Sequence, residues 1–182
     1  MSVAKRVDEK KAVLSTLSKY PCKEALAHAE RWKTIPCLSA EAESAINKIK
    51  ETMLSRNLKA TASRDNRNAR NALDGRRSSR WSTGRGMKPG DWFQLDLGIE
   101  STVSGLTLDT RNSSNDYPRG YEIYTSFDGG SWGRPIVTGK GTNPLTEIKF
   151  GKPVRTRFIK IIQTGSSDSW HWSIHELKID VK

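Results

Sequence analysis

The spacing of apolar residues divides the chain into an N-terminal part with helical periodicity and a longer part with short β-type runs. Apolar positions between Val13 and Leu17 recur three or four residues apart, as on one face of a helix. Pro21 and Pro36 interrupt this pattern, and an apolar face with the same spacing resumes after each proline. Residues 1–58 therefore predict three short helices.

The two prolines are each followed by a cysteine, Cys22 and Cys37, which suggests a short helical array, a remnant of repeats of the HEAT kind. One such unit cannot bury its apolar face alone, so we expect it to pack on the rest of the chain or on a further part of a parent protein. The cysteines either form a disulfide between helices or remain as two buried thiols. Two cysteines without a nearby histidine pair argue against a zinc site.

From residue 59 to 182, short runs rich in β-branched and aromatic residues alternate with clusters of Gly, Asn, Asp and Pro. The candidate strands are Trp92–Leu97, Val103–Thr110, Gly120–Thr125, Ile136–Thr138, Leu145–Phe150, Arg155–Thr164 and Ile174–Val181. Their regular spacing predicts a mainly β fold, an antiparallel sandwich of about eight strands, preceded by the small helical segment.

Positive charge is concentrated at the start of this β region. The net charge is +11, and residues 64–90 hold eight arginines and lysines against Asp65 and Asp74, a net of +6. Such a patch indicates an acidic partner, such as a polyanionic glycan, a phospholipid headgroup or a nucleic acid. The alternative is a solvated loop that only aids solubility.

The sequence lacks the motifs of several other protein classes. No apolar run approaches the about 20 residues that span a bilayer, and the N-terminus has no secretion signal. The chain has three histidines and neither a nucleophile elbow nor a phosphate-binding loop. His171 and His175 have the spacing of a helical zinc pair, but they run from a loop into a predicted strand. We therefore expect no enzymatic activity.

Four motifs occur in a defined order in the β region. They are Asn71-Ala72-Leu73-Asp74-Gly75, then Asp91-Trp92-Phe93-Gln94-Leu95-Asp96-Leu97-Gly98, then Arg119-Gly120-Tyr121-Glu122-Ile123-Tyr124 with Ser126-x-Asp128-Gly129-x-x-Trp132, and finally Ile174-His175-Glu176-Leu177. In this order the segment 60–181 resembles the discoidin, or coagulation factor V/VIII type C, domain, and most of all the bacterial carbohydrate-binding modules of family 32. The resemblance implies a jelly-roll sandwich whose loops at one end bind a ligand, commonly a terminal sugar.

The resemblance also implies a structural calcium ion that joins the first loop to the last strand. Carried over by position, its ligands are the side chains of Asp74, Ser79 and Glu176 and the carbonyls of Asn71, Arg76 and His175. Calcium takes six to eight oxygens, and this set supplies donors of that kind. Two departures stand out: a serine at position 79 replaces the usual threonine, and Arg76-Arg77-Ser78 replaces a loop often rich in Asn, Asp and Pro.

Most of the six tryptophans have structural places, in the family motifs, under the first loop or in the helices. Trp170 lies in a polar loop and could stack its ring on the apolar face of a sugar. The hydrogen-bonding groups that a sugar needs are supplied by nearby loop residues. The predicted ligand-binding set is Trp170, His171, Arg111, Asn115, Asp116, Tyr117 and Arg119. A structural salt bridge is the alternative for Arg119, and a packed loop lid is the alternative for Trp170.

We therefore expect a non-catalytic carbohydrate-binding module that targets a larger protein to a glycan or polysaccharide, with anionic glycans favoured by the arginines. The alternative is a protein- or membrane-surface interaction module of the discoidin type, which ranks lower because no paired apolar spike is evident. Nucleic-acid binding ranks lower still, because stacking platforms are missing among the arginines apart from Trp81. We expect the protein to act outside the cytoplasm, as part of a larger secreted protein.

Overall fold

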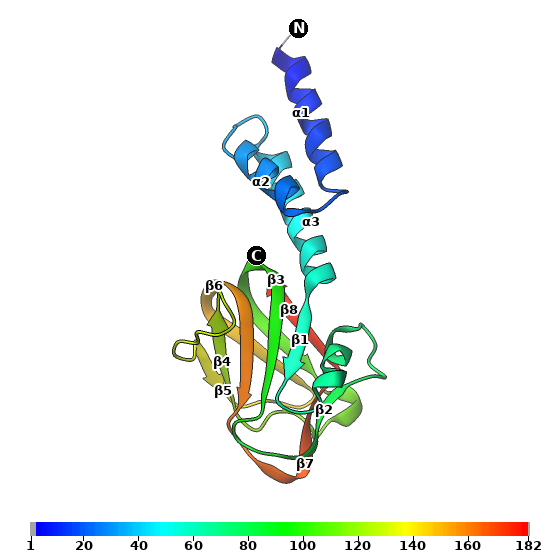
Figure 1. Ribbon diagram of the computed structural model, residues 1–182, viewed down its shortest axis with the longest axis vertical. Helices are drawn as coiled ribbons and strands as arrows, with labels where there is room; N and C mark the ends of the chain where they lie inside the picture. The colour runs from blue at the N-terminus through cyan, green and yellow to red at the C-terminus, as the bar shows by residue number, and fades with distance from the viewer. Residues whose placement is uncertain (1–2, 182) are drawn as a thin grey trace. The chain divides into compact units, whose positions relative to one another are not determined.

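The computed structural model describes residues 3–181, which form two compact units, one that ends at Asn57 and one that begins at Leu58 (Figure 1). The first unit is helical and the second is a β-sandwich, as the sequence predicts. Within residues 3–181, none of the helices has both the length and the apolar character that crossing a membrane requires.

The helical unit consists of α1 (Val3–Leu17), α2 (Lys23–Trp32) and α3 (Ser39–Asn57). Its small core forms around Leu14, Ala29, Leu38 and Ile49, all of which are almost fully buried. The Cys22 sulfur accepts a hydrogen bond from the Ala25 N–H at 3.4 Å and so caps α2. Both predictions for the cysteines are wrong, because the two thiols are unpaired and exposed.

The described part of the β unit, residues 58–181, contains eight strands and two 3₁₀ helices. In chain order these are β1 (Lys59–Ala62), η1 (Asn66–Leu73), β2 (Trp81–Met87), β3 (Trp92–Asp109), η2 (Arg111–Ser113), β4 (Tyr121–Ser126), β5 (Val137–Gly139), β6 (Leu145–Gln163), β7 (Ser167–Ile174) and β8 (Glu176–Val181). The large sheet has the order β1-β3-β6-β4-β5, with β8 also paired to β3, and β2 pairs with β7 in a small sheet. All of these pairs are antiparallel.

Two long strands replace four of the predicted short ones. The strands predicted on either side of Gly98 are both parts of β3, which stays paired with β6 through register shifts at Asp96/Ser101 and Val103/Gly105. Gly98 has a φ of 73°, and its N–H donates to Asp96 Oδ1 at 2.8 Å. The glycine and proline signals that suggested strand ends therefore mark bends within continuous strands.

The pair β2 and β7 was not predicted, because glycines in β2 and serines in β7 interrupt any alternation. The pairing joins residues about 90 positions apart, Trp81 opposite Ile174 and Ser82 opposite Ser173. Gly86 is required for it, since a Cβ there would lie 2.6 Å from the carbonyl oxygen of Ser167. Trp170, predicted in a loop, is therefore part of a strand.

The core of the sandwich contains a cluster of aromatic rings. Trp81 is fully buried, with ring centroids of both Phe93 and Trp172 at 4.9 Å. Its indole N–H donates to the carbonyl of Arg64 at 2.7 Å, which ties the start of β2 to the chain before η1. This cluster anchors β2 and β7 and so positions the residues at their ends.

Candidate functional site

A pocket of about 440 Å³ opens beside β7, where the end of η2 and the loop that follows it approach the start of β2. Its lining consists of polar side chains and one large aromatic ring. The residues are Arg80, Asn112, Ser113, Ser114, Asn115, Asp116, Ser169, Trp170 and His171.

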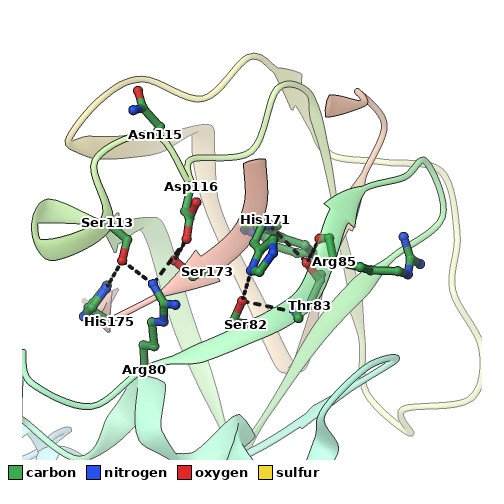
Figure 2. A network of polar contacts seen from close by, with 12 residues as sticks. Arg80, Ser82, Thr83, Arg85, Ser113, Asn115, Asp116, His171, Ser173 and His175 are labelled. Carbon is green, nitrogen blue, oxygen red and sulfur yellow. Dashed lines mark hydrogen bonds and ion pairs between the residues drawn. The ribbon is translucent and has the colours of Figure 1, made fainter. Parts of the chain in front are cut away.

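A buried carboxylate in the lining, Asp116, organises a network of polar contacts (Figure 2). Asp116 is 7% exposed, and its Oδ2 accepts hydrogen bonds from Ser173 Oγ at 3.0 Å and from Arg80 Nη1 at 3.3 Å. The backbone N–H of Ser173 also donates to the Asp116 carbonyl at 3.0 Å. Asp116 therefore holds the Arg80 guanidinium beside the pocket, and the opposite charges offset each other.

A serine and a histidine extend the network. The Ser113 hydroxyl lies 3.0 Å from Nε2 of His175, whose Nδ1 lies 2.9 Å from the carbonyl oxygen of Arg77. Arg80 donates to the same Ser113 oxygen, so this hydroxyl contacts both His175 and Arg80. The network thus acts as a scaffold that fixes the direction of Arg80.

Trp170 and His171 enter the pocket lining from β7. The Trp170 residue is 45% exposed, although its backbone N–H is held by Ser167 Oγ at 3.1 Å. His171 is half-buried, with Nδ1 3.4 Å from Ser82 Oγ on the paired strand β2 (Figure 2). An exposed indole on a strand with a fixed backbone offers a stacking surface that is already in place before a ligand binds.

The pocket brings together four of the predicted ligand-binding residues, Trp170, His171, Asn115 and Asp116. Arg111, Tyr117 and Arg119 do not line it. Arg111 turns toward Asp109: its Nη2 donates to Oδ2 at 2.7 Å, and its Nε lies 3.0 Å from Oδ2 and 3.2 Å from Oδ1.

Arg119 and Tyr117 support the loop that leads into the pocket. The Arg119 guanidinium lies 3.8 Å from the centre of the Tyr117 ring, and it donates to the carbonyls of Tyr117 and Asn115 at 3.0 and 2.8 Å. These contacts fix the backbone on both sides of Asp116. Arg119 thus contacts the loop backbone, and neither Arg119 nor Tyr117 lines the pocket.

Sequence reasoning missed Arg80, Asn112, Ser113, Ser114 and Ser169 as lining residues. Three of these lie in the segment 111–117, where the residue types alone did not separate lining from supporting positions. Arg80 was considered only as part of the basic stretch. Recognising Trp81–Met87 as a strand would have placed Arg80 at its start, next to the predicted site.

The predicted calcium ligands lie around the turn after η1 and the start of β8. Asp74 accepts a hydrogen bond from the Arg76 N–H at 2.9 Å, and Ser79 Oγ lies 2.8 Å from its Oδ2. Ser79 Oγ is also 2.8 Å from the carbonyl oxygen of Arg76. Asn71 closes the turn through a hydrogen bond from Nδ2 to the carbonyl of Arg80 at 3.1 Å.

The surroundings of the Glu176 carboxylate show whether these residues fit a calcium ion. Its Oε2 is buried without a hydrogen-bond partner, and burial, together with the nearby charge of Asp74, raises its pKa. Burial would also raise the pKa of Asp74, but hydrogen bonds from Ser79 and Arg76 and the charges of Arg76 and Arg70 outweigh it and lower that pKa. An unpartnered buried oxygen beside a second carboxylate fits a bound cation.

The rest of the donor set determines which cation fits. Among residues 3–181, no three His, Cys, Asp or Glu side chains converge as metal ligands. A cation here therefore depends on hydroxyl and carbonyl oxygens in addition to two carboxylates. An all-oxygen set of this kind suits calcium and not zinc.

Comparison with known proteins agrees with this fold. The F5/8 type C domain profile matches residues 57–177. A sialidase from Micromonospora viridifaciens is 36% identical over 130 residues, covering 66% of this chain and 20% of the sialidase. The chain thus spans about a fifth of that relative's length.

Two solved structures are similar over the same region. The family 32 carbohydrate-binding module of C. perfringens NanJ, in complex with galactose, is 24% identical with a TM-score of 0.59 and covers 70% of this chain and 96% of that module. The family 32 module of AlyQ, in complex with 4,5-unsaturated mannuronic acid, is 30% identical with a TM-score of 0.55. The match covers 66% of this chain and 92% of that module.

The chain belongs to the F5/8 type C domain family. Its sandwich is like the family 32 carbohydrate-binding modules, which are non-catalytic parts of glycan-active enzymes. The predicted resemblance to this family and the predicted fold class are therefore confirmed.

Proposed function

We propose that the pocket beside β7 binds a sugar unit of a glycan or polysaccharide and thereby attaches a larger protein to it. The observation that carries this proposal is the exposed Trp170 ring next to a guanidinium, Arg80, that Asp116 holds in a fixed direction. A sugar has an apolar C–H face and a rim of hydroxyls, so it needs one stacking surface and a few oriented donors and acceptors.

The remaining lining side chains complete this pattern. Asn112, Ser114, Asn115 and Ser169 are exposed in the pocket and supply amide and hydroxyl groups that can both donate and accept. The AlyQ module, which binds an unsaturated uronic acid, supports a ligand of this class and extends it to acidic polysaccharides. The sialidase relative supports a place within a larger enzyme that acts on glycans. The expected place of action, outside the cytoplasm, stays a prediction.

Asp74, Ser79 and Glu176 would hold a calcium ion through their side chains, together with the carbonyls of Asn71, Arg76 and His175. When bound, the ion would link the turn after η1 to the start of β8 by supplying positive charge to two carboxylates. In the protein itself, the Asn112 side chain donates to the Arg77 carbonyl at 2.7 Å, so the turn also contacts the pocket wall. Rigidity of the turn therefore supports the pocket.

The experiment that tests this function is a glycan array of neutral and anionic sugars, probed with the full chain in calcium at low and high salt. Binding to a defined sugar that persists at high salt is the expected result. If no glycan is bound, the sugar site is wrong, and a protein- or membrane-surface interaction module becomes the better interpretation.

A further inference from the structure

A row of unpaired arginines lies on the solvent side of η1. In a 3₁₀ helix, side chains three positions apart align, and Arg67 and Arg70 are therefore neighbours roughly 6 Å apart along the axis. The row formed by Ala69 and Ala72 is fully buried. The helix thus has an apolar side packed on the sandwich and a cationic side in solvent.

Arg76 joins this row at the end of the helix. Arg76 lies just beyond Leu73, the last residue of η1, and is exposed, as Arg67 and Arg70 are. None of the ion pairs formed by residues 3–181 includes Arg67, Arg70 or Arg76. Their charges are therefore available to a partner.

The row reaches the pocket through the turn that follows. Arg77 is 58% exposed in its side chain, and its 3.6 Å pair with Asp109 is shared with Arg111, which binds that carboxylate more closely. The Arg77 carbonyl accepts the hydrogen bond from Asn112, a residue of the pocket lining. We call the surface of Arg67, Arg70, Arg76 and Arg77 the arginine ridge.

We propose that the arginine ridge is a second binding surface that holds the continuing chain of an acidic polysaccharide whose one sugar unit occupies the pocket. This proposal rests on the proposed function of the pocket. A polysaccharide with a carboxylate or sulfate on successive units presents a line of anions, and a guanidinium pairs with each as a planar fork. Inside the pocket Arg80 is offset by Asp116, so preference for an acidic chain arises on the ridge and not in the pocket.

Charge alone would also attract a nucleic acid, but the ridge lacks what a single strand needs. Trp81, the aromatic residue that follows these arginines in the sequence, is fully buried and has no face free for a base. The ridge instead continues into a pocket with an exposed indole and hydroxyl-binding groups. These observations favour a polysaccharide.

The test compares a β-1,4-mannuronate hexamer with the neutral β-1,4-mannohexaose, which differ only in their carboxylates. Titration calorimetry of the full chain at low salt is expected to show tighter binding of the acidic hexamer. The double substitution R67Q/R70Q should weaken that binding about fivefold and reduce its salt dependence, since each exposed pair contributes a few tenths to 1 kcal/mol. Binding of the neutral hexamer should not change.

The matched control is R134Q/K140Q, which removes the same charge near β5. That strand is the edge of the large sheet opposite β1, against which η1 packs. Three results would each overturn the proposal. They are an equal loss of affinity for the acidic hexamer in both double variants, equal affinity of the unmodified chain for the two hexamers, and tighter binding of an oligothymidylate than of the mannuronate hexamer. If W170A weakens binding of the neutral hexamer and R67Q/R70Q separately weakens binding of the acidic hexamer, both surfaces are supported. If W170A changes nothing but R67Q/R70Q does, the pocket assignment fails and the ridge stands.

Discussion

Replacing Trp170 by alanine should weaken sugar binding about tenfold without unfolding the protein. A tryptophan has at most about 250 Å² of surface, of which 45% is exposed here, roughly 110 Å². A sugar covers one face of the ring, about half of that area. At about 25 cal/mol per Å², the lost burial is about 1.4 kcal/mol, or a factor of ten in Kd.

Stability should change little, because the Trp170 ring is exposed and its strand is held through the backbone and through Trp172. The assay is titration calorimetry with the sugar selected on the array, combined with thermal unfolding of each variant. Trp170→Phe should retain much of the affinity, since a smaller ring still stacks. The control is Phe127→Ala, which removes an aromatic ring that is 58% exposed and does not line the pocket.

Unchanged affinity in Trp170→Ala, with wild-type unfolding temperature, would refute the stacking argument. A loss of affinity in Phe127→Ala as large as that in Trp170→Ala would refute it as well, since it would move the binding surface away from the pocket.

Two further predictions concern stability. Calcium at a hundredfold excess over its Kd should stabilise the protein by about 2.7 kcal/mol. Glu176→Gln should remove this effect, whereas the control Glu147→Gln should retain it. Equal calcium-induced shifts of the unfolding temperature in the two variants would contradict the assigned site. Asp128 has a lowered pKa because N–H groups of Ser131 and Gly130 donate to its carboxylate at 2.8 and 2.9 Å. A carboxyl whose pKa is lowered by folding stabilises the folded state at any pH above its unfolded pKa of about 3.9, and this stabilisation decreases as the pH falls below that value. Asp128→Ala should therefore lower the free energy of unfolding more at pH 7 than at a pH below the unfolded pKa, as measured by urea unfolding.

The supporting residues show why residue types were a partial guide to the site. Arg111 and Arg80 are both arginines beside predicted loops, and each is paired with a buried aspartate. Only the direction in which the aspartate holds the guanidinium decides that Arg80 lines the pocket and Arg111 does not. That direction depends on packing between segments that are distant in the sequence.

The sequence by itself determined the division into a helical and a β part, the alternation that buries Phe93, Leu95 and Leu97, and the order of family motifs, because these follow from local periodicity and turn chemistry. Only the tertiary structure decided that β2 pairs with β7 and that one pocket forms where they meet the loop after η2. The glycines of β2 and the serines of β7 carry no periodic signal, so the pairing of the two strands depends on the buried contact between Trp81 and Trp172, which lie about 90 residues apart. Long-range packing of this kind sets the composition of the site.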